Sequence, residues 1–268
     1  MINIVTCVNK KSGAGHISRM LNLQSYLKKK GYKSNLVLID TNKLNKFIVL
    51  NKVKYTKYSK LRRNKNILNI IDLPIYYSAT ETNKKLIGKK IYFDRPKLKN
   101  SISQKIIKKG NEVILKNFFL SPPFKNHKKK INFLISGGGV IDMPKALIND
   151  IKVKKFSHFY IPPFLIKRNK LLLSRKSYLK YLSSSKCLIT NYGISVFEAL
   201  IAKIPVLISK CKKEDFNNVK LLNLKFINHF DLSKNFIAQY KKEIFKNSFY
   251  VKNNEITDLI SLHDFSNN

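Results

Sequence analysis

Short apolar runs alternate with longer stretches whose apolar residues recur every three to four positions. In the first part of the chain, residues 16–30 have this helical period, and Gly31 follows them as a typical helix-ending residue. A shorter helix is predicted around 82–87. The apolar runs that predict strands lie at 2–8, 34–40, 66–72 and 89–94. Strands that alternate with helices in this way predict a parallel sheet covered by helices.

The alternation weakens from residue 95 to residue 130, and we interpret this stretch as an interdomain region. It then returns. The strands predicted in the second half lie at 131–136, 157–161, 186–190, 205–209 and 225–230, and the helices begin near 142 and cover 174–182, 195–202, 216–222 and the C-terminal region. The predicted fold class is α/β, with two Rossmann-like domains, residues 1–125 and 126–268, facing each other across a cleft.

The ends of the strands predict where a ligand binds. Ligands of parallel α/β sheets lie beyond the carboxyl ends of the strands. We therefore expect the cleft to be lined by the loops after Val8, Asp72, Ser136, Thr190 and Ser209.

The composition indicates how large the hydrophobic core can be and in which cellular compartment we expect the protein. The chain has 268 residues, 44% of them hydrophobic, enough for the cores of two medium-sized domains. No apolar stretch approaches the roughly 18 residues that span a bilayer, and the first eight residues are typical of a buried strand and not of a signal peptide. Cys7, Cys187 and Cys211 lack the paired spacing of metal ligands. We expect reduced thiols in a cytoplasmic protein.

The charge is strongly positive. Lysine and arginine number 53 against 15 acidic residues, a net charge of +38. One interpretation is a polyanionic partner, either nucleic acid or an acidic membrane surface. The other is drift in composition, because the chain is also rich in Asn, Ile, Phe and Tyr, the usage expected of AT-rich coding DNA. The lysines are scattered and form no single stripe, which favours the second interpretation and no specific nucleic-acid partner. The electrostatic field of this net positive charge still attracts nucleotides and other phosphates.

A glycine-rich turn between the first strand and the first helix contains the first candidate chemistry. Gly13 and Gly15 permit close approach of a ligand to the backbone, and His16 follows at the helix start. The positive end of the helix dipole disfavours the imidazolium, so His16 suits the role of a general base. Arg19 lies one turn later on the same face. The alternatives are a structural histidine and an ordinary surface arginine.

Two further turns carry candidate chemistry in the second half. The run Gly137-Gly138-Gly139 follows a strand and precedes a helix, which suits an anion cradle or a tight turn capped by Asp142. Nearer the C-terminus, Asn191-Tyr192-Gly193 separates a strand from a helix that carries Glu198. A carboxylate in that position can accept hydrogen bonds from ribose, or it can simply stabilise the helix dipole.

These motifs occur in the same order as in a known family. GAGHISR, the GGG turn and ITNYGISVFEALIAKIPVLIS make the chain resemble the UDP-2,4-diacetamido-2,4,6-trideoxy-β-L-altropyranose hydrolases of pseudaminic acid biosynthesis. Those enzymes are in turn similar to the peptidoglycan N-acetylglucosaminyltransferase, which has the two-domain GT-B fold. The likeness extends over nearly the whole chain. Its most specific part is the Gly-x-Gly-His-x-x-Arg element.

The resemblance implies a hydrolysis that uses neither a cofactor nor a metal. UDP lies on the C-terminal domain, and His16 deprotonates a water that attacks the anomeric carbon with inversion. The substrate-binding residues that the resemblance implies, together with those proposed above, are Gly13, Gly15, Arg19, Asp72, Tyr76, Tyr77, Gly137, Gly138, Gly139, Asn191, Tyr192, Gly193, Ile194, Ser195, Glu198 and Lys213. The loop at 210–214 differs from the Asn-Gln of the family, and residues 73–75 displace the tyrosines from Asp72. The identity of the sugar stays open.

Two other functions stay open beside the hydrolase. In a glycosyltransferase of the same fold, His16 activates an acceptor hydroxyl in place of water, and the basic surface at 43–63 gives weak association with an anionic membrane. A non-enzymatic nucleic-acid binder would use the charge alone. The partner that we expect is a nucleotide-sugar, most simply a UDP-sugar, bound by a monomer.

Overall fold

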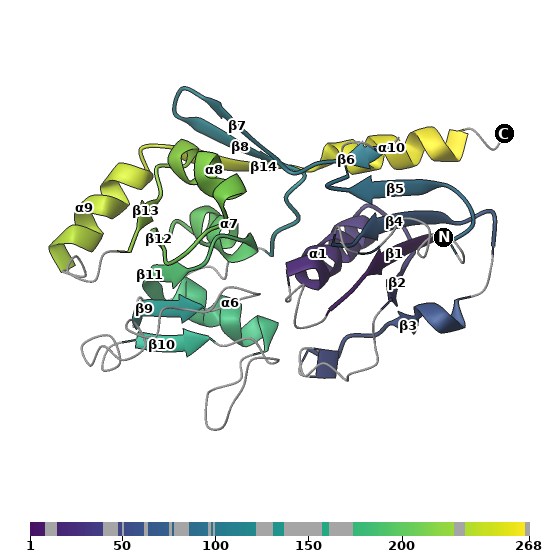
Figure 1. Cartoon of the computed structure of the whole chain (residues 1–268), viewed down its shortest axis with the longest axis horizontal. Coiled ribbons are helices and arrows are strands. Elements are labelled where there is room, and N and C mark those ends of the chain that lie inside the picture. Colours follow the sequence, from purple (N-terminus) through teal and green to yellow (C-terminus); the bar gives the residue numbers. More distant parts are fainter. Residues whose placement is uncertain are drawn as a thin grey trace.

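The chain forms two parallel α/β sheets and a smaller third sheet. The computed structural model describes residues 1–8, 15–39, 48–49, 51–61, 64–74, 77, 86–95, 98, 100–121, 131–136, 157–160, 174–227 and 234–265. Figure 1 shows the two large sheets side by side, with the arrowheads of β4 and β5 directed toward the second sheet and those of β9 and β10 directed back. The predicted fold class, α/β with two parallel sheets whose strands alternate with helices as in Rossmann-like domains, is confirmed.

The first sheet is built from six parallel strands in the order β3-β2-β1-β4-β5-β6. The elements are β1 (Ile2–Thr6), α1 (Gly15–Lys29), β2 (Ser34–Leu38), β3 (Thr56–Lys57), the 3-10 turn η1 (Tyr58–Lys60), β4 (Leu68–Asp72), β5 (Lys90–Phe93) and β6 (Ser101–Ile102). Helix α1 buries Met20, Leu23 and Leu27, spaced three and four residues apart, against the core. This is the apolar face that the sequence pattern predicts.

Buried amides hold neighbouring strands of this sheet in register. Asn3 of β1 donates from Nδ2 to Asn69 Oδ1 of β4 at 3.1 Å and accepts from Asn35 of β2 at 3.4 Å. Asn35 in turn accepts from Thr56 of β3 at 3.2 Å. A slip of one residue between β1 and β4 would break the bond between Asn3 and Asn69, and a buried polar group that loses its partner costs about 1–3 kcal/mol.

The second sheet has five parallel strands in the order β10-β9-β11-β12-β13. Its elements are β9 (Ile131–Ser136), β10 (Ser157–Tyr160), α6 (Arg175–Ser183), β11 (Ser185–Thr190), α7 (Ile194–Ile201), β12 (Val206–Ile208), η2 (Lys213–Asp215), α8 (Phe216–Leu221), β13 (Lys225–Phe226) and α9 (Lys234–Ile244). Helix α6 begins where the sequence predicts, because the Ser174 side chain accepts from the backbone N–H of Ser177.

The stretch 95–130 is more regular than expected. It contains β6 and a hairpin of β7 (Lys105–Lys109) and β8 (Glu112–Lys116), and β14 (Ser248–Lys252) pairs in parallel with β8. The stretch that we interpret as an interdomain region therefore contains regular strands as well. The expected boundary between residues 125 and 126 lies outside the described residues.

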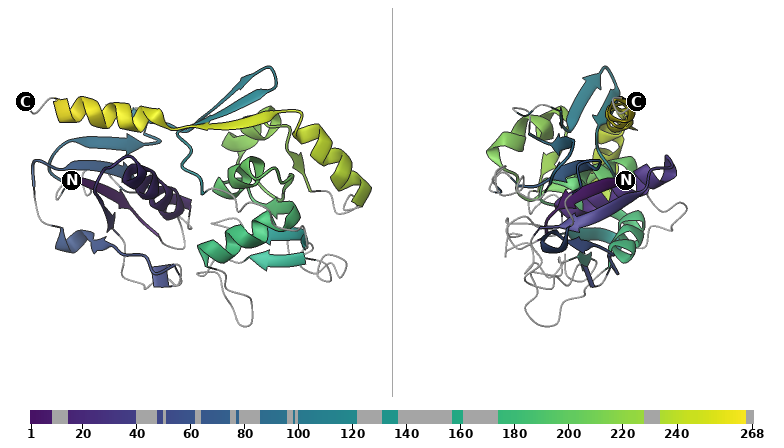
Figure 2. Two further views of the ribbon diagram at one scale, coloured as in Figure 1. Left: turned by 180° about the vertical axis from the view of Figure 1, so that it is seen from behind. Right: turned by 90° about the vertical axis from the view of Figure 1, so that its right-hand side faces the viewer.

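The C-terminal helix α10 (Asn254–Phe265) packs on the first sheet. Its Ile256 and Ile260 are buried in the same apolar cluster as β1, α1 and Phe119. The chain thus passes between the two halves twice, and the two crossings touch: Asn117 N donates to Lys252 O at 2.9 Å, and Asn253 Nδ2 donates to Phe118 O at 3.0 Å. Figure 2 shows α10 beside the first sheet from two further directions.

Candidate active site

His16 lies at the N-terminus of the first helix, α1, which follows the first strand in the sequence. It is the second residue of α1, and Asp72, in register with Thr6 of the adjacent β1, ends β4. The His16 Nδ1 atom is 2.8 Å from Asp72 Oδ1. The imidazole is one-quarter exposed, whereas the Asp72 side chain is 1% exposed. A ligand can therefore reach the histidine, and the protein encloses the carboxylate.

Arg19 holds the same carboxylate from the other side. Its Nε donates to Asp72 Oδ2 at 2.8 Å and its NH2 to Asp72 Oδ1 at 2.6 Å, a bidentate pair. Burial alone would raise the pKa of Asp72, but the charges of Arg19 and His16 and their hydrogen bonds hold that pKa well below its usual range. Burial would lower the pKa of Arg19, and Asp72 and Asp94 outweigh it, so that pKa is raised.

The ionised Asp72 fixes the form of His16. A carboxylate only accepts hydrogen bonds, so Nδ1 of His16 carries the proton that is shared with Asp72. In the neutral imidazole, Nε2 then has the free lone pair. The helix dipole was expected to disfavour the imidazolium, and the structure adds an opposing negative charge at 2.8 Å. His16 is therefore placed to act as a base, and Asp72 is the partner of its protonated form.

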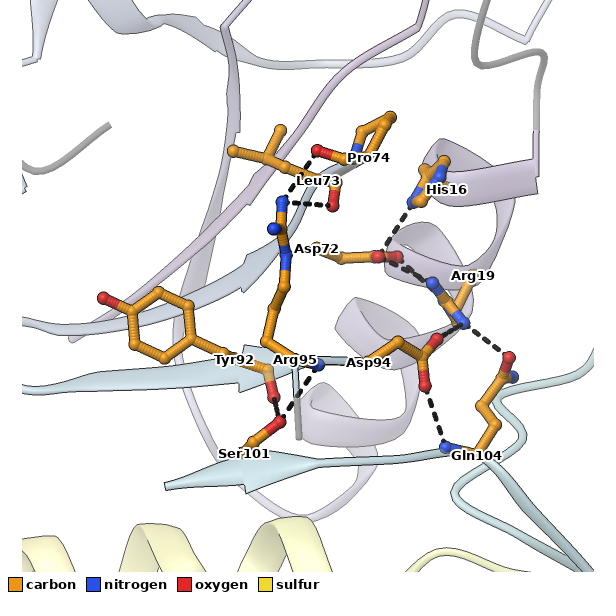
Figure 3. Close-up of polar contacts among 10 residues, drawn as sticks. All are labelled: His16, Arg19, Asp72, Leu73, Pro74, Tyr92, Asp94, Arg95, Ser101 and Gln104. Carbon is orange, nitrogen blue, oxygen red and sulfur yellow. Dashed lines mark hydrogen bonds and ion pairs between the residues drawn. The ribbon is translucent and has the colours of Figure 1, made fainter. Parts of the chain in front are cut away.

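Asp94 and Gln104 complete the Arg19 network, and the sequence analysis missed both. Arg19 NH1 donates to Asp94 Oδ2 at 2.8 Å and also to Gln104 Oε1, while Gln104 N donates to Asp94 Oδ1 at 3.0 Å (Figure 3). Asp94 directly follows β5, so the rule that selected Asp72 at the end of β4 also applies to it. Nothing in the sequence marks Gln104.

Arg95 holds the loop that follows Asp72. One of its terminal nitrogens donates to the carbonyl oxygens of Leu73 and Pro74, at 3.3 and 2.7 Å (Figure 3). The same nitrogen donates to the carbonyl oxygen of Tyr77 at 3.5 Å. Arg95 therefore fixes the backbone at Leu73, Pro74 and Tyr77. Tyr77 lies in this loop, and Tyr76 lies outside the described residues.

Glycine at Gly15 and Gly193 is not required by packing among the described residues. A Cβ built at either position meets nothing within 4 Å, and the φ of 165° at Gly193 is extended backbone. A methyl group at either position would contact nothing in the described part of the chain. Gly13, Gly137, Gly138 and Gly139 lie outside the described residues.

The second half presents its predicted residues at the end of β11 and the start of α7. Asn191 is buried and accepts from Ser209 Oγ at 2.5 Å, and Tyr192 packs edge-on against Phe197 at 5.7 Å between ring centroids. Burial, and then the charge of Asp215, raise the pKa of Tyr192, which keeps this phenol neutral.

Gly193, Ile194 and Ser195 form the start of α7. Gly193 is the N-cap and has no side chain to accept from the helix N–H groups. That leaves backbone donors at this end without a side-chain cap, as an anion site needs. Lys213, also predicted, is exposed in η2.

Glu198 is deeply buried at an interface between the halves. Its side chain is 1% exposed, and Oε1 accepts from the Arg175 guanidinium and, at 3.5 Å, from the backbone N–H of Ser121. Its Oε2 is a buried acceptor with no hydrogen-bond partner in the described part of the chain. The ribose contact expected of Glu198 stays a prediction.

Arg175 and Ser121 join this carboxylate to the first half. Arg175 N donates to Asn51 Oδ1 at 2.6 Å, and Ser121 Oγ donates to Asn22 Oδ1 at 2.8 Å. Asn22 lies on α1, three residues after Arg19. One helix therefore contacts both the His16–Asp72 pair and the residues around Glu198. Neither Arg175 nor Ser121 was predicted, because their roles depend on contacts between the halves.

The described residues match neither the pattern of a metal centre nor that of a membrane-spanning helix. Among the described residues, no three His, Cys, Asp or Glu side chains gather to hold a metal ion. The helices in the described ranges include none that is long and apolar enough to cross a membrane.

The comparisons with known proteins give fold-level likeness alone. No protein-family model and no curated protein matches the chain. Among solved structures, the chain is similar to the glycosyltransferase SnogD from Streptomyces nogalater, with TM-score 0.42, 8% identity, 91% of this chain covered and 95% of that one. It is also similar to a Listeria monocytogenes protein named as a UDP-N-acetylglucosamine 2-epimerase (0.44, 9%, 91% and 88%) and to WaaG, a glycosyltransferase involved in lipopolysaccharide biosynthesis (0.39, 9%, 91% and 90%). At these values the likeness decides neither substrate nor reaction.

Proposed function

We propose that the protein is an enzyme that transfers the sugar of a nucleotide-sugar to an oxygen nucleophile with inversion, as an inverting glycosyltransferase does. The observation that carries the proposal is the contact between His16 Nδ1 and the buried, ionised Asp72. It gives a reachable imidazole with its free lone pair on Nε2, at the edge of the first sheet where α/β proteins bind ligands.

The pair suits removal of a proton from a hydroxyl group. When Nε2 takes the proton, the imidazolium stays hydrogen-bonded to Asp72, which orients the ring and offsets its charge. The surrounding charges support the same step. Asp72 accepts hydrogen bonds from both His16 and Arg19, and Arg19 also contacts Asp94, so the carboxylate that orients the imidazole is itself held in place. Asp72 and Arg19 act as positioning residues in this proposal.

The nucleotide is proposed to lie against the second half. The uncapped start of α7 at Gly193 offers backbone donors for a diphosphate. Glu198 of the same helix is proposed as the ribose acceptor from the sequence resemblance alone. The glycine run 137–139 follows β9 at the same edge of that sheet and belongs to this proposal from the sequence. A nucleoside diphosphate is a good leaving group, so the reaction as proposed needs no second carboxylic acid, unlike simple glycoside hydrolysis.

Hydrolysis is the second candidate, and the Gly-x-Gly-His-x-x-Arg element favours it through the resemblance to the UDP-sugar hydrolases. The same His16 pair would then deprotonate water and release free sugar. In either case we propose a monomer that acts in the cytoplasm on a nucleotide-sugar, with no cofactor and no specific nucleic-acid partner.

One experiment tests the class and separates the two candidates. Thermal unfolding in the presence of UDP, GDP or CMP identifies the base, because a ligand at 100 times its Kd stabilises the fold by about 2.7 kcal/mol. The corresponding nucleotide-sugars are then incubated with and without candidate acceptors, and the products are read by NMR. Nucleotide release in buffer alone indicates a hydrolase, and release that needs an acceptor indicates a transferase. The absence of stabilisation by any nucleotide would overturn both.

A further inference from the structure

The small sheet β14-β8-β7 has one face in the protein core and one face in solvent. Val113 and Leu115 of β8 are fully buried in the core of the second half. Because side chains alternate along a strand, Glu112, Ile114 and Lys116 lie on the opposite face. Their cross-strand partners share this outer face: Lys109, Ile107 and Lys105 on β7, and Ser248, Tyr250 and Lys252 on β14.

An apolar row runs across the middle of the outer face. Ile107, Ile114 and Tyr250 are directly opposite one another on the three strands. Ile107 is 37% exposed and Tyr250 is 51% exposed. The solvent face of a sheet normally carries polar residues, so three apolar positions in register on that face are unusual.

A lysine row lies directly beside the apolar row. Lys105 and Lys252 are exposed, and Lys116 between them is partly exposed and pairs with Glu255 at 2.8 Å. Lys109 is exposed in the row on the other side, which also contains Glu112. Tyrosine and lysine have long apolar parts that end in a polar group, and such side chains are typical of a surface where an apolar layer meets water.

The sheet is also placed where it can meet a large flat partner. In Figures 1 and 2 the β7–β8 hairpin stands above the rest of the chain in every view. The outer strand β7 carries Lys105, Lys108 and Lys109, and lysines on an edge strand disfavour pairing with another strand. The face of the sheet, and not its edge, is therefore the surface available for binding.

We propose that this outer face binds an anionic lipid surface, with Ile107, Ile114 and Tyr250 against the interface and the lysines against the lipid phosphates. The combination of an apolar row and a lysine row favours lipid over nucleic acid, since phosphate backbones use the lysines and leave the isoleucines in water. This surface differs from the basic stretch 43–63, part of which lies outside the described residues. The inference does not depend on the proposed reaction.

The net charge of +38 makes matched controls essential, because any anionic vesicle attracts this protein. The test is cosedimentation with vesicles of phosphatidylcholine alone and with 30% phosphatidylglycerol, in 0.1 M and 0.5 M salt. The apolar variant is Ile107→Thr with Tyr250→Thr, which keeps strand propensity. The charge variant is Lys105→Gln with Lys252→Gln. The control is Lys29→Gln with Lys186→Gln, two exposed lysines outside this sheet that remove the same charge.

The proposal predicts that vesicle binding weakens in both variants and changes little in the control. The charge variant binds anionic vesicles at least about tenfold more weakly in 0.1 M salt, since each lysine near such a surface contributes about fivefold. The apolar variant binds about tenfold more weakly at both salt concentrations. The control changes binding less than about threefold. Equal losses in the charge variant and the control would overturn the proposal, because they would show an effect of net charge alone.

Two further results would also overturn the inference. If the apolar variant keeps full vesicle binding while the charge variant loses binding to duplex DNA, the face binds nucleic acid. If the apolar variant changes the sedimentation mass of the free protein, the face joins two copies of the chain. Unfolding midpoints within about 2 °C of wild type show that the exposed substitutions leave the fold intact.

Discussion

Replacing Asp72 by asparagine removes the charge at the centre of the His16 and Arg19 contacts and keeps the shape of the side chain. In the variant, the buried Arg19 loses its bidentate partner and keeps only its contacts with Asp94 and Gln104 among those described. Breaking a buried ion pair by removing one partner costs about 3–5 kcal/mol. We expect a loss of this size in the free energy of unfolding at pH 7, measured by urea denaturation.

The pH dependence of that loss follows from the depressed pKa of Asp72. A carboxyl whose pKa is lower in the folded state stabilises the protein above its unfolded pKa of about 3.9, and this stabilisation is lost as pH falls through the folded value. The Asn variant lacks the contribution at every pH. The contribution of the Asp72 carboxyl to the stability difference between wild type and variant is therefore fully present above about pH 5 and shrinks below about pH 4.

The control is Asp94→Asn, whose carboxylate is 43% exposed and contacts Arg19 through one oxygen. We expect a loss below about 1 kcal/mol for it. Imidazole ¹⁵N spectra report the tautomer directly, with the proton on Nδ1 of His16 in wild type and redistributed in Asp72→Asn. The reasoning is refuted if Asp72→Asn matches Asp94→Asn in stability at pH 7, or if its deficit is unchanged at pH 3.

The other predictions concern single side chains, and urea denaturation measures each. Arg19→Lys replaces a forked donor by one ammonium group and costs about 2–4 kcal/mol, so an unchanged midpoint would contradict the network. Gly88→Ala costs more than about 2 kcal/mol, because φ is +104° and a Cβ would lie 2.4 Å from a carbonyl oxygen, whereas Gly193→Ala costs less than about 0.5 kcal/mol; equal costs would show that the packing argument is wrong. Tyr240→Phe removes a hydroxyl that donates to one backbone group at 2.7 Å and accepts from another at 3.1 Å, and costs about 1–2 kcal/mol; a neutral result would show that neither bond matters.

Local sequence patterns predict the elements that repeat with a clear period. Helix α1, strands β4 and β11 and the start of α6 at Ser174 all lie where apolar spacing and capping residues place them. The β7–β8 hairpin also had a local signal, Gly110-Asn111 between two apolar runs, which the interpretation as a linker passed over. The pairing of β14 with β8 could not be predicted in this way, because more than a hundred residues separate the two strands.

Some residues of the candidate site can also be predicted from local sequence, whereas the contacts between them cannot. His16 and Asp72 follow from strand ends in a parallel sheet, a rule that uses only local sequence. The sequence indicates neither that Asp72 holds His16 and Arg19 together nor that Arg175 reaches Glu198, because these contacts depend on how helices pack against strands and against the other half. Burial changes the interpretation of Arg19, from an expected substrate-binding residue to a group whose guanidinium contacts Asp72 and Asp94.

The central claim is that His16 is the base in cleavage of a nucleotide-sugar. The direct measurement is single-turnover nucleotide release from a donor whose nucleotide stabilises the fold, compared between wild type and His16→Asn. We expect the variant to bind the donor with similar affinity and to release nucleotide about 10²- to 10⁴-fold more slowly, the usual contribution of a positioned general base. Equal rates for the two proteins would contradict the account.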